Sequence, residues 1–88
     1  MKRSPDYLIR QVAGRYVLAP MGEAAKHFSG MITMNETGKF LWELLEQEQT
    51  MESLTKALSE AYGVAPEQAT TDIDAYLNPL KPIGAVID

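Results

Sequence analysis

A strand that runs directly into a capped helix is the feature of this chain that most restricts its fold. The segment Gly30 to Glu46 reads GMITMNETGKFLWELLE. Met31 to Met34 form a short apolar run typical of a strand, and the residues behind them are apolar at helical spacing. Asn35 lies between the two patterns, where its side-chain oxygen can accept a hydrogen bond from a free N–H of the first helical turn. The sequence therefore predicts a strand over residues 31–34 and a helix from about Glu36.

The composition describes one small globular domain spanning residues 1–88. A chain of 88 residues buries roughly 60% of the surface that it exposes when unfolded, which suits one modest core. Its 45% hydrophobic and 23% charged residues are ordinary values that argue against disorder and against a membrane protein. The chain has no cysteine, which excludes disulfides and thiolate chemistry. The two basic residues at its start are not followed by the apolar region of a signal sequence, and no segment approaches the length of a membrane span. We expect a cytoplasmic protein.

Two strands are predicted before the junction. Residues 7–12 and 15–19 are rich in Tyr, Ile, Val and Leu, and Ala13-Gly14 between them is typical of a tight hairpin turn. Residues 20–30 have Pro and Gly at their edges and no clear periodicity, which predicts a loop that can hold one helical turn.

Two further helices are predicted after the junction. Thr50 is positioned to cap a second helix, which Gly63 ends, and Pro66 opens a third helix that Pro79 and Pro82 end or kink. The apolar stripe of the second helix is Met51, Leu54, Leu58, Ala61 and Tyr62, and that of the third is Ala69, Ile73, Tyr76, Leu77 and Leu80. The apolar tail, residues 83–87, either adds a short strand or docks as a terminus.

The predicted fold class is α+β: a small three-stranded antiparallel sheet followed by three α-helices, in a winged helix-turn-helix-like arrangement. This arrangement raises the hypothesis of DNA binding. The third helix, however, carries Glu67, Asp72 and Asp74 and no Lys or Arg between its two flanking prolines. Phosphate backbones would repel such a helix, so the sequence argues against nucleic acid as a partner.

The charges of the two halves of the chain are opposite. Residues 1–34 carry five Lys or Arg and two Asp or Glu, whereas residues 35–88 carry three and ten. The halves therefore bear +3 and −7, for a net charge of −4. The acidic half is the helical one.

The residues that could support catalysis are few and scattered. The single histidine, His27, lies in a predicted loop, where such a residue is usually solvated. Asp72 and Asp74 are two positions apart on a helix and point to different sides, so they cannot form a carboxylate pair. No phosphate loop, nucleophile motif or metal-ligand cluster is present, and the sequence predicts no enzyme, no metal and no cofactor.

Trp42 and Met34 each have two interpretations. Trp42 either packs in the core, which is the role that we expect, or contacts a ligand. Gly38, one turn before it, indicates that a backbone or a ring packs closely there. Met34 either fills a gap in the core or belongs, with Met31, to a surface that accepts varied apolar side chains.

The runs GMITMNETGKFLWELLE, TMESLTKAL and AYGVAPEQATTDIDAYL together resemble the PqqD-like family, which is named after pyrroloquinoline quinone synthesis protein D. These domains are also called RiPP recognition elements, RiPP meaning ribosomally synthesised and post-translationally modified peptide. The resemblance spans residues 30–83. It departs from the family pattern at the end of the third helix, NPLKPIGA, and the loop of residues 20–30 matches no motif of the family.

The resemblance implies a non-enzymatic adaptor that binds the leader segment of a precursor peptide and presents it to a modifying enzyme, often a radical-SAM protein. The leader adds as a strand beside the third strand, in a groove also walled by the third helix. Carried onto this chain, the peptide-binding residues are Met31, Ile32, Thr33, Met34, Ala69, Ile73, Tyr76 and Leu77. The alternatives are a winged-helix transcriptional regulator and a structural dimerisation module, and the choice between monomer and homodimer stays open.

Overall fold

A three-stranded antiparallel sheet forms the first layer of the structure, a computed structural model that describes residues 1–27 and 31–88. Its order is β2 (Tyr7–Val12), β3 (Arg15–Pro20) and β4 (Ile32–Met34). Ala13 and Gly14 connect β2 to β3 with positive φ angles of 51° and 79°, as a two-residue hairpin turn requires. The predicted hairpin and the predicted α+β fold class are confirmed.

The third strand of the sheet is shorter than predicted. The ladder between β3 and β4 ends at the pair Leu18 and Ile32, so the strand prediction was wrong for Met31. Met31 has no strand partner opposite it, and 70% of its surface is exposed. The loop before it contains one short helix, α1 (Glu23–His27), in line with the predicted helical turn. Residues 28–30 of that loop, and the side chain of His27, lie outside the described residues.

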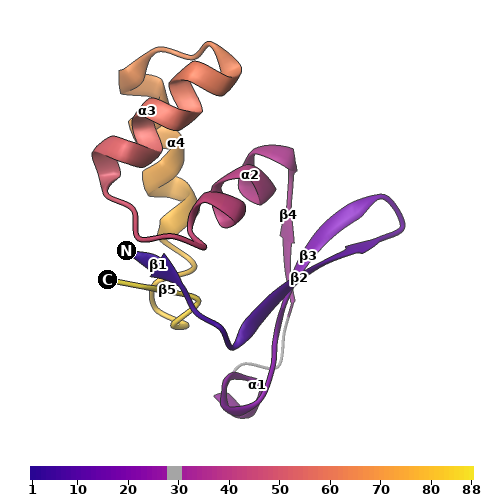
Figure 1. Cartoon of the computed structure of the whole chain (residues 1–88). Coiled ribbons are helices and arrows are strands. Elements are labelled where there is room, and N and C mark those ends of the chain that lie inside the picture. The colour runs from indigo at the N-terminus through magenta and orange to yellow at the C-terminus, as the bar shows by residue number, and fades with distance from the viewer. Residues whose placement is uncertain (28–30) are drawn as a thin grey trace.

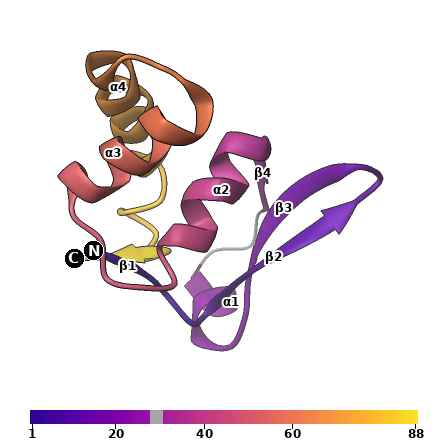
Figure 2. The same cartoon turned by 45° about the horizontal axis from the view of Figure 1, so that its top comes forward.

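Helix α2 (Glu36–Leu44) starts where the cap predicted it. The Gly38 N–H donates to Asn35 Oδ1 at 2.8 Å, which satisfies one of the free donors of the first turn. Trp42, in the last turn, is fully buried, as expected for a core residue. Seen from both directions, α2 lies between the sheet and helices α3 and α4 (Figures 1 and 2).

Helices α3 (Met51–Tyr62) and α4 (Pro66–Leu77) form the last layer. Thr50 caps α3 in a capping box with Ser53, and Gly63 ends it with a left-handed φ of 68°. Pro66 occupies the start of α4, which ends before Pro79 as predicted.

The core lies between the sheet and the helices and includes Leu18, Leu41, Leu54, Leu58 and Ile73. The apolar stripe predicted for α3 was wrong at its end, because the core beneath this helix ends at Leu58. Ala61 and Tyr62 are exposed. The Tyr62 ring packs edge-on against Phe40 of α2 instead, with 5.5 Å between the ring centroids.

The two ends of the chain lie side by side (Figure 1). They form a two-stranded antiparallel sheet of β1 (Lys2–Arg3) and β5 (Val86–Ile87). Of the two interpretations of the tail, the strand is therefore the one that the structure shows. Ala85, which precedes β5, and Val86, its first residue, are both buried.

Candidate functional site

Strand β4 is an edge of the three-stranded sheet. It pairs with β3 along one side, and no strand among residues 1–27 and 31–88 pairs with its other side. The free N–H and C=O groups of such an edge are a template on which a further strand can add. The edge is short, because only Ile32, Thr33 and Met34 belong to it.

A small apolar groove of about 120 Å³ lies beside this edge. It is formed by β4, the first turn of α2, the end of α4 and the turn that follows α4. Its lining residues are Ile32, Thr33, Met34, Gly38, Tyr76, Pro79 and Leu80. Met34 and Leu80 are buried in its floor, whereas Thr33 and Pro79 are exposed at its rim.

Gly38 permits the close packing that forms this groove. A Cβ atom at Gly38 would lie 3.2 Å from Met34 Cβ and 3.3 Å from Tyr76 Cε1, closer than ordinary van der Waals contact. The inference that a ring or backbone packs against Gly38 is thus confirmed, and the ring is that of Tyr76.

The hydroxyl of Tyr76 is part of the same contact. It donates a hydrogen bond to Met34 Sδ at 3.8 Å, which joins α4 to β4. Burial raises the pKa of Tyr76 well above its usual value, and the charge of Arg3 lowers it only in part. Tyr76 therefore stays protonated at neutral pH and keeps this donor.

A second and more polar hollow of about 470 Å³ adjoins the groove. It lies between the hairpin turn and the start of α2, and it shares Thr33 and Met34 with the groove. Its other lining residues are Gln11, Gly14, Arg15, Tyr16, Asn35 and Glu36. The edge strand is therefore accompanied by an apolar hollow and a polar hollow that meet at its last two residues.

The structure brings together half of the predicted site residues. Ile32, Thr33, Met34 and Tyr76 all line the groove. Met31 precedes the strand and lines neither of the two hollows beside β4.

The other three predicted residues require a correction, because Ala69, Ile73 and Leu77 are buried in the core. The apolar stripe of α4 faces the protein interior along most of its length, and only its end, at Tyr76, reaches the groove. Sequence reasoning missed Pro79 and Leu80 as groove residues. Leu80 was predicted on the apolar stripe of the third helix, but the helix ends at Leu77, so Leu80 reaches the groove from the turn that follows it. Pro79 served only as a signal for the helix end.

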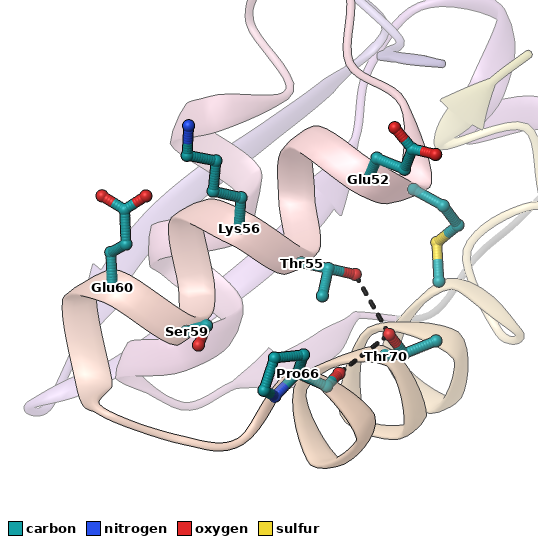
Figure 3. A pocket seen from close by; sticks show the side chains of 8 residues that line it. Glu52, Thr55, Lys56, Ser59, Glu60, Pro66 and Thr70 are labelled. Atoms are coloured by element: carbon teal, nitrogen blue, oxygen red, sulfur yellow. Dashed lines mark hydrogen bonds between the residues drawn. The ribbon is translucent and has the colours of Figure 1, made fainter.

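A third hollow, about 490 Å³ in volume, lies between α3 and α4 (Figure 3). Thr55 and Thr70 share a hydrogen bond of 3.2 Å across it. The charged side chains of its α3 wall, Glu52, Lys56 and Glu60, point away from Thr70 rather than into the hollow (Figure 3). They do not converge on a common point, as the ligands of a bound group would.

Two other kinds of site are absent from the part of the chain that the structure describes. No three or more His, Cys, Asp or Glu side chains in residues 1–27 and 31–88 are placed to hold a metal ion. Within the same residues no helix combines the length and the apolar character needed to cross a bilayer. The two helical aspartates, Asp72 and Asp74, are both exposed.

The fold and the site define a small winged helix-turn-helix-like domain whose sheet has one open edge beside an apolar groove. A family model described as Coenzyme PQQ synthesis protein D (PqqD) matches residues 15–86. The chain therefore belongs to the PqqD family, which confirms the family predicted from the sequence.

One solved structure has the same fold at low sequence identity. It is described as "TbiB1 in Complex with the TbiA(beta) Leader Peptide" and matches with a TM-score of 0.73 and 20% identity, over 97% of this chain and 93% of that chain. No curated protein matches the chain. Family membership supports the predicted function of a peptide-binding adaptor, and neither finding favours a transcriptional regulator or a dimerisation module.

Proposed function

We propose that this chain binds the leader segment of a ribosomally made precursor peptide at the edge of β4 and presents it to a modifying enzyme. The observation that carries the proposal is the open edge strand with an apolar groove beside it. Membership of the PqqD family and the fold shared with TbiB1, whose structure is described with a leader peptide, support it.

Strand addition explains how such an edge would bind a peptide. Backbone hydrogen bonds to β4 supply affinity for any extended segment, and the side chains of that segment then alternate between the two faces of the sheet. One set would face the groove of Ile32, Tyr76 and Pro79, whose volume of about 120 Å³ suits a single apolar side chain. The groove would therefore select leaders with an apolar residue at one position.

The proposed adaptor carries no catalytic group of its own. We propose that a separate enzyme, of which the radical-SAM class is the leading candidate, performs the modification in the cytoplasm. The adaptor holds the leader in one extended conformation, which lowers the conformational entropy that is lost when the precursor binds the enzyme.

Titration of the leader peptide into the isotopically labelled chain tests the site. The probe is a synthetic leader peptide taken from a candidate short precursor gene. We expect backbone amide shifts at Ile32 to Met34 and at Tyr76, Leu77, Asn78 and Leu80, with little change on the outer side of α3; Pro79 has no amide proton. A leader that is modified in the same pathway but leaves these amides unchanged would contradict the proposal.

A second test addresses strand addition itself. Leader peptides methylated at one backbone nitrogen at a time lose one hydrogen-bond donor each. Because every second residue of an added strand points its N–H toward β4, we expect affinity to fall at alternate positions and to be kept between them. Equal losses at consecutive positions would argue for another binding mode.

A further inference from the structure

The sheet has a second face, which meets the proposed leader site only along the edge of β4. Residues that pair directly across an antiparallel ladder lie on the same face, and the pairs Leu8 with Ala19, Arg10 with Val17, and Val12 with Arg15 define one of them. The alternating residues, such as Tyr7, Leu18 and Met34, are buried on the opposite face. We call the face formed by these six paired residues the outer sheet face.

The outer sheet face is apolar and open. Leu8 is 40% exposed and Val12 is 56% exposed, and Val17 and Ala19 between them are half-buried. In Figure 1 the helices α2, α3 and α4 all lie on the other side of the sheet, and the hairpin of β2 and β3 extends away from them. Exposed apolar side chains on a sheet face that no helix covers are one mark of an interaction surface.

Two arginines give the outer sheet face its charge. Arg10 and Arg15 are exposed, and neither forms an ion pair with another residue in the described part of the chain. Ten of the twelve acidic residues belong to residues 35–88, the half of the chain that follows the sheet's first two strands. Both guanidinium groups are therefore available to the carboxylates of a partner.

The outer sheet face is continuous with the edge proposed to bind the leader. Val17 pairs with Thr33 of β4, so Thr33 extends this face to the edge. A leader strand added beside β4 would extend it by one more strand, with every second leader side chain on the same face. A partner bound there would touch this chain and the leader together.

We propose that the outer sheet face docks the modifying enzyme, through an apolar surface of that enzyme that bears carboxylates. The inference rests on the proposed adaptor function. A second copy of this chain fits less well, because a two-fold face-to-face contact would bring the arginines of both copies together. Two arginines also give only weak attraction to an anionic membrane.

Charge reversal of both arginines tests the proposal with the full chain. The variant R10E/R15E is compared with K56E/K81E, which reverses two lysines on the helical side. Calorimetry measures the affinity for a purified candidate enzyme that modifies the same precursor, and fluorescence anisotropy measures the affinity for the labelled leader. We expect R10E/R15E to weaken enzyme binding by roughly tenfold or more. Arg10→Glu alone, which keeps Arg15 of the polar hollow beside β4, should weaken enzyme binding with leader binding unchanged, and K56E/K81E should change neither.

Four results would overturn the inference. Two concern the enzyme: unchanged enzyme binding in R10E/R15E, and a larger loss of enzyme binding in K56E/K81E. The third is sedimentation of the chain alone as a dimer that Val12→Glu dissociates, which would make a second copy the occupant. The fourth is co-sedimentation of the chain with vesicles of phosphatidylcholine and phosphatidylglycerol, which would make a membrane the occupant. If the leader fails to bind the wild-type chain while R10E/R15E still abolishes enzyme binding, the leader proposal falls and the docking surface stands. Because Arg10 and Arg15 are exposed, we do not expect their substitution to unfold the protein. Circular dichroism checks that a loss of enzyme binding does not come from misfolding.

Discussion

Gly38 weakens helix α2, but it permits the close packing that forms the groove. Gly38→Ala in an open helix would stabilise the protein by about 0.5–1 kcal/mol. Here the new Cβ meets Met34 Cβ at 3.2 Å, and that atom is fixed by the backbone of β4. Overpacking of this kind costs about 1 kcal/mol or more, so we expect no gain in stability, a loss of up to about 1 kcal/mol, and weaker leader binding.

Urea unfolding and leader anisotropy measure the two effects of Gly38→Ala. Thr71→Ala, at an exposed position of α4, supplies the comparison, because it raises helix propensity away from the groove. A full gain in stability at Gly38, with leader affinity unchanged, would show that Met34 and Tyr76 adapt freely and that the glycine is not needed for the groove.

Tyr76 is expected to make the protein sensitive to alkaline pH. Burial raises its pKa in the folded state above the ordinary value of 10.0, so the unfolded chain releases this proton at a lower pH than the folded one. The stability that this difference contributes is complete below about pH 10 and is lost as the pH rises beyond it, by at most about 1.4 kcal/mol per pH unit. We expect Tyr76→Phe to make this decline shallower.

The free energy of unfolding in urea, measured at several values from about pH 8 to about pH 11, checks the decline. Tyr7 adds to it, because burial and then the charge of Asp6 raise the pKa of Tyr7 as well. Tyr7→Phe also removes the hydrogen bond of 2.7 Å to the Ile83 carbonyl, so that variant should be weaker at every pH. Identical slopes for the wild-type chain and Tyr76→Phe would mean that the Tyr76 hydroxyl titrates as in water.

The sequence predicts the role of a single residue well when the residue's immediate neighbours in the chain determine that role. Gly38 is unusual within its own helix, and that alone indicated a close neighbour. Ala69, Ile73 and Leu77 repeat at helical spacing, which shows that they share a face but not whether that face is covered. Only the packed structure shows that the core covers them and that Tyr76 alone reaches the groove.

At the scale of elements, the N-terminal caps of α2 and α3 can be compared to distinguish an effect on stability from an effect on leader binding. Asn35 Oδ1 accepts from the Gly38 N–H at 2.8 Å, and Thr50 Oγ1 accepts from the Ser53 N–H at 3.0 Å. Asn35→Ala and Thr50→Ala should each destabilise the protein by about 1 kcal/mol. Asn35 joins β4 to α2 beside the groove, so we expect only its variant to weaken leader binding as well.

Urea unfolding and leader anisotropy on both cap variants check this prediction. The two variants serve as controls for each other because their expected losses in stability match. If both weaken leader binding equally, the loss reflects overall stability rather than the position of the β4 edge.

The ends of the helices were predicted well because the residues that mark them act through local contacts. Asn35, Thr50, Gly63 and Pro66 each mark a helix end through contacts within a few residues. The start of β4 was misplaced by one residue, because the ladder with β3 sets it and Met31 itself carries no signal that the ladder ends.

At the scale of the whole molecule, the first residues of the chain connect its last strand to α2. The Arg3 N–H donates to the Leu45 carbonyl and the Ser4 N–H donates to the Ala85 carbonyl, both at 2.8 Å. The Arg3 guanidinium donates to the Trp42 carbonyl at 3.1 Å and lies 5.7 Å from the centre of the Trp42 ring. Because β1 has two residues and its partner lies at the other end of the chain, no local pattern could have predicted it.

The closure of the two termini should therefore contribute to global stability. Val86 is 3% exposed and pairs with Arg3, whereas the next residue, Ile87, is 51% exposed and pairs with Lys2. Val86→Ala removes buried methyl groups and should lower the free energy of unfolding by about 2 kcal/mol, while Ile87→Ala should lower it by less than about 0.5 kcal/mol. Urea unfolding followed by the fluorescence of buried Trp42 measures both, because Trp42 contacts the same N-terminal segment. Similar small losses in both variants would mean that β1 and β5 separate before the core unfolds, so that the closure adds nothing to its stability.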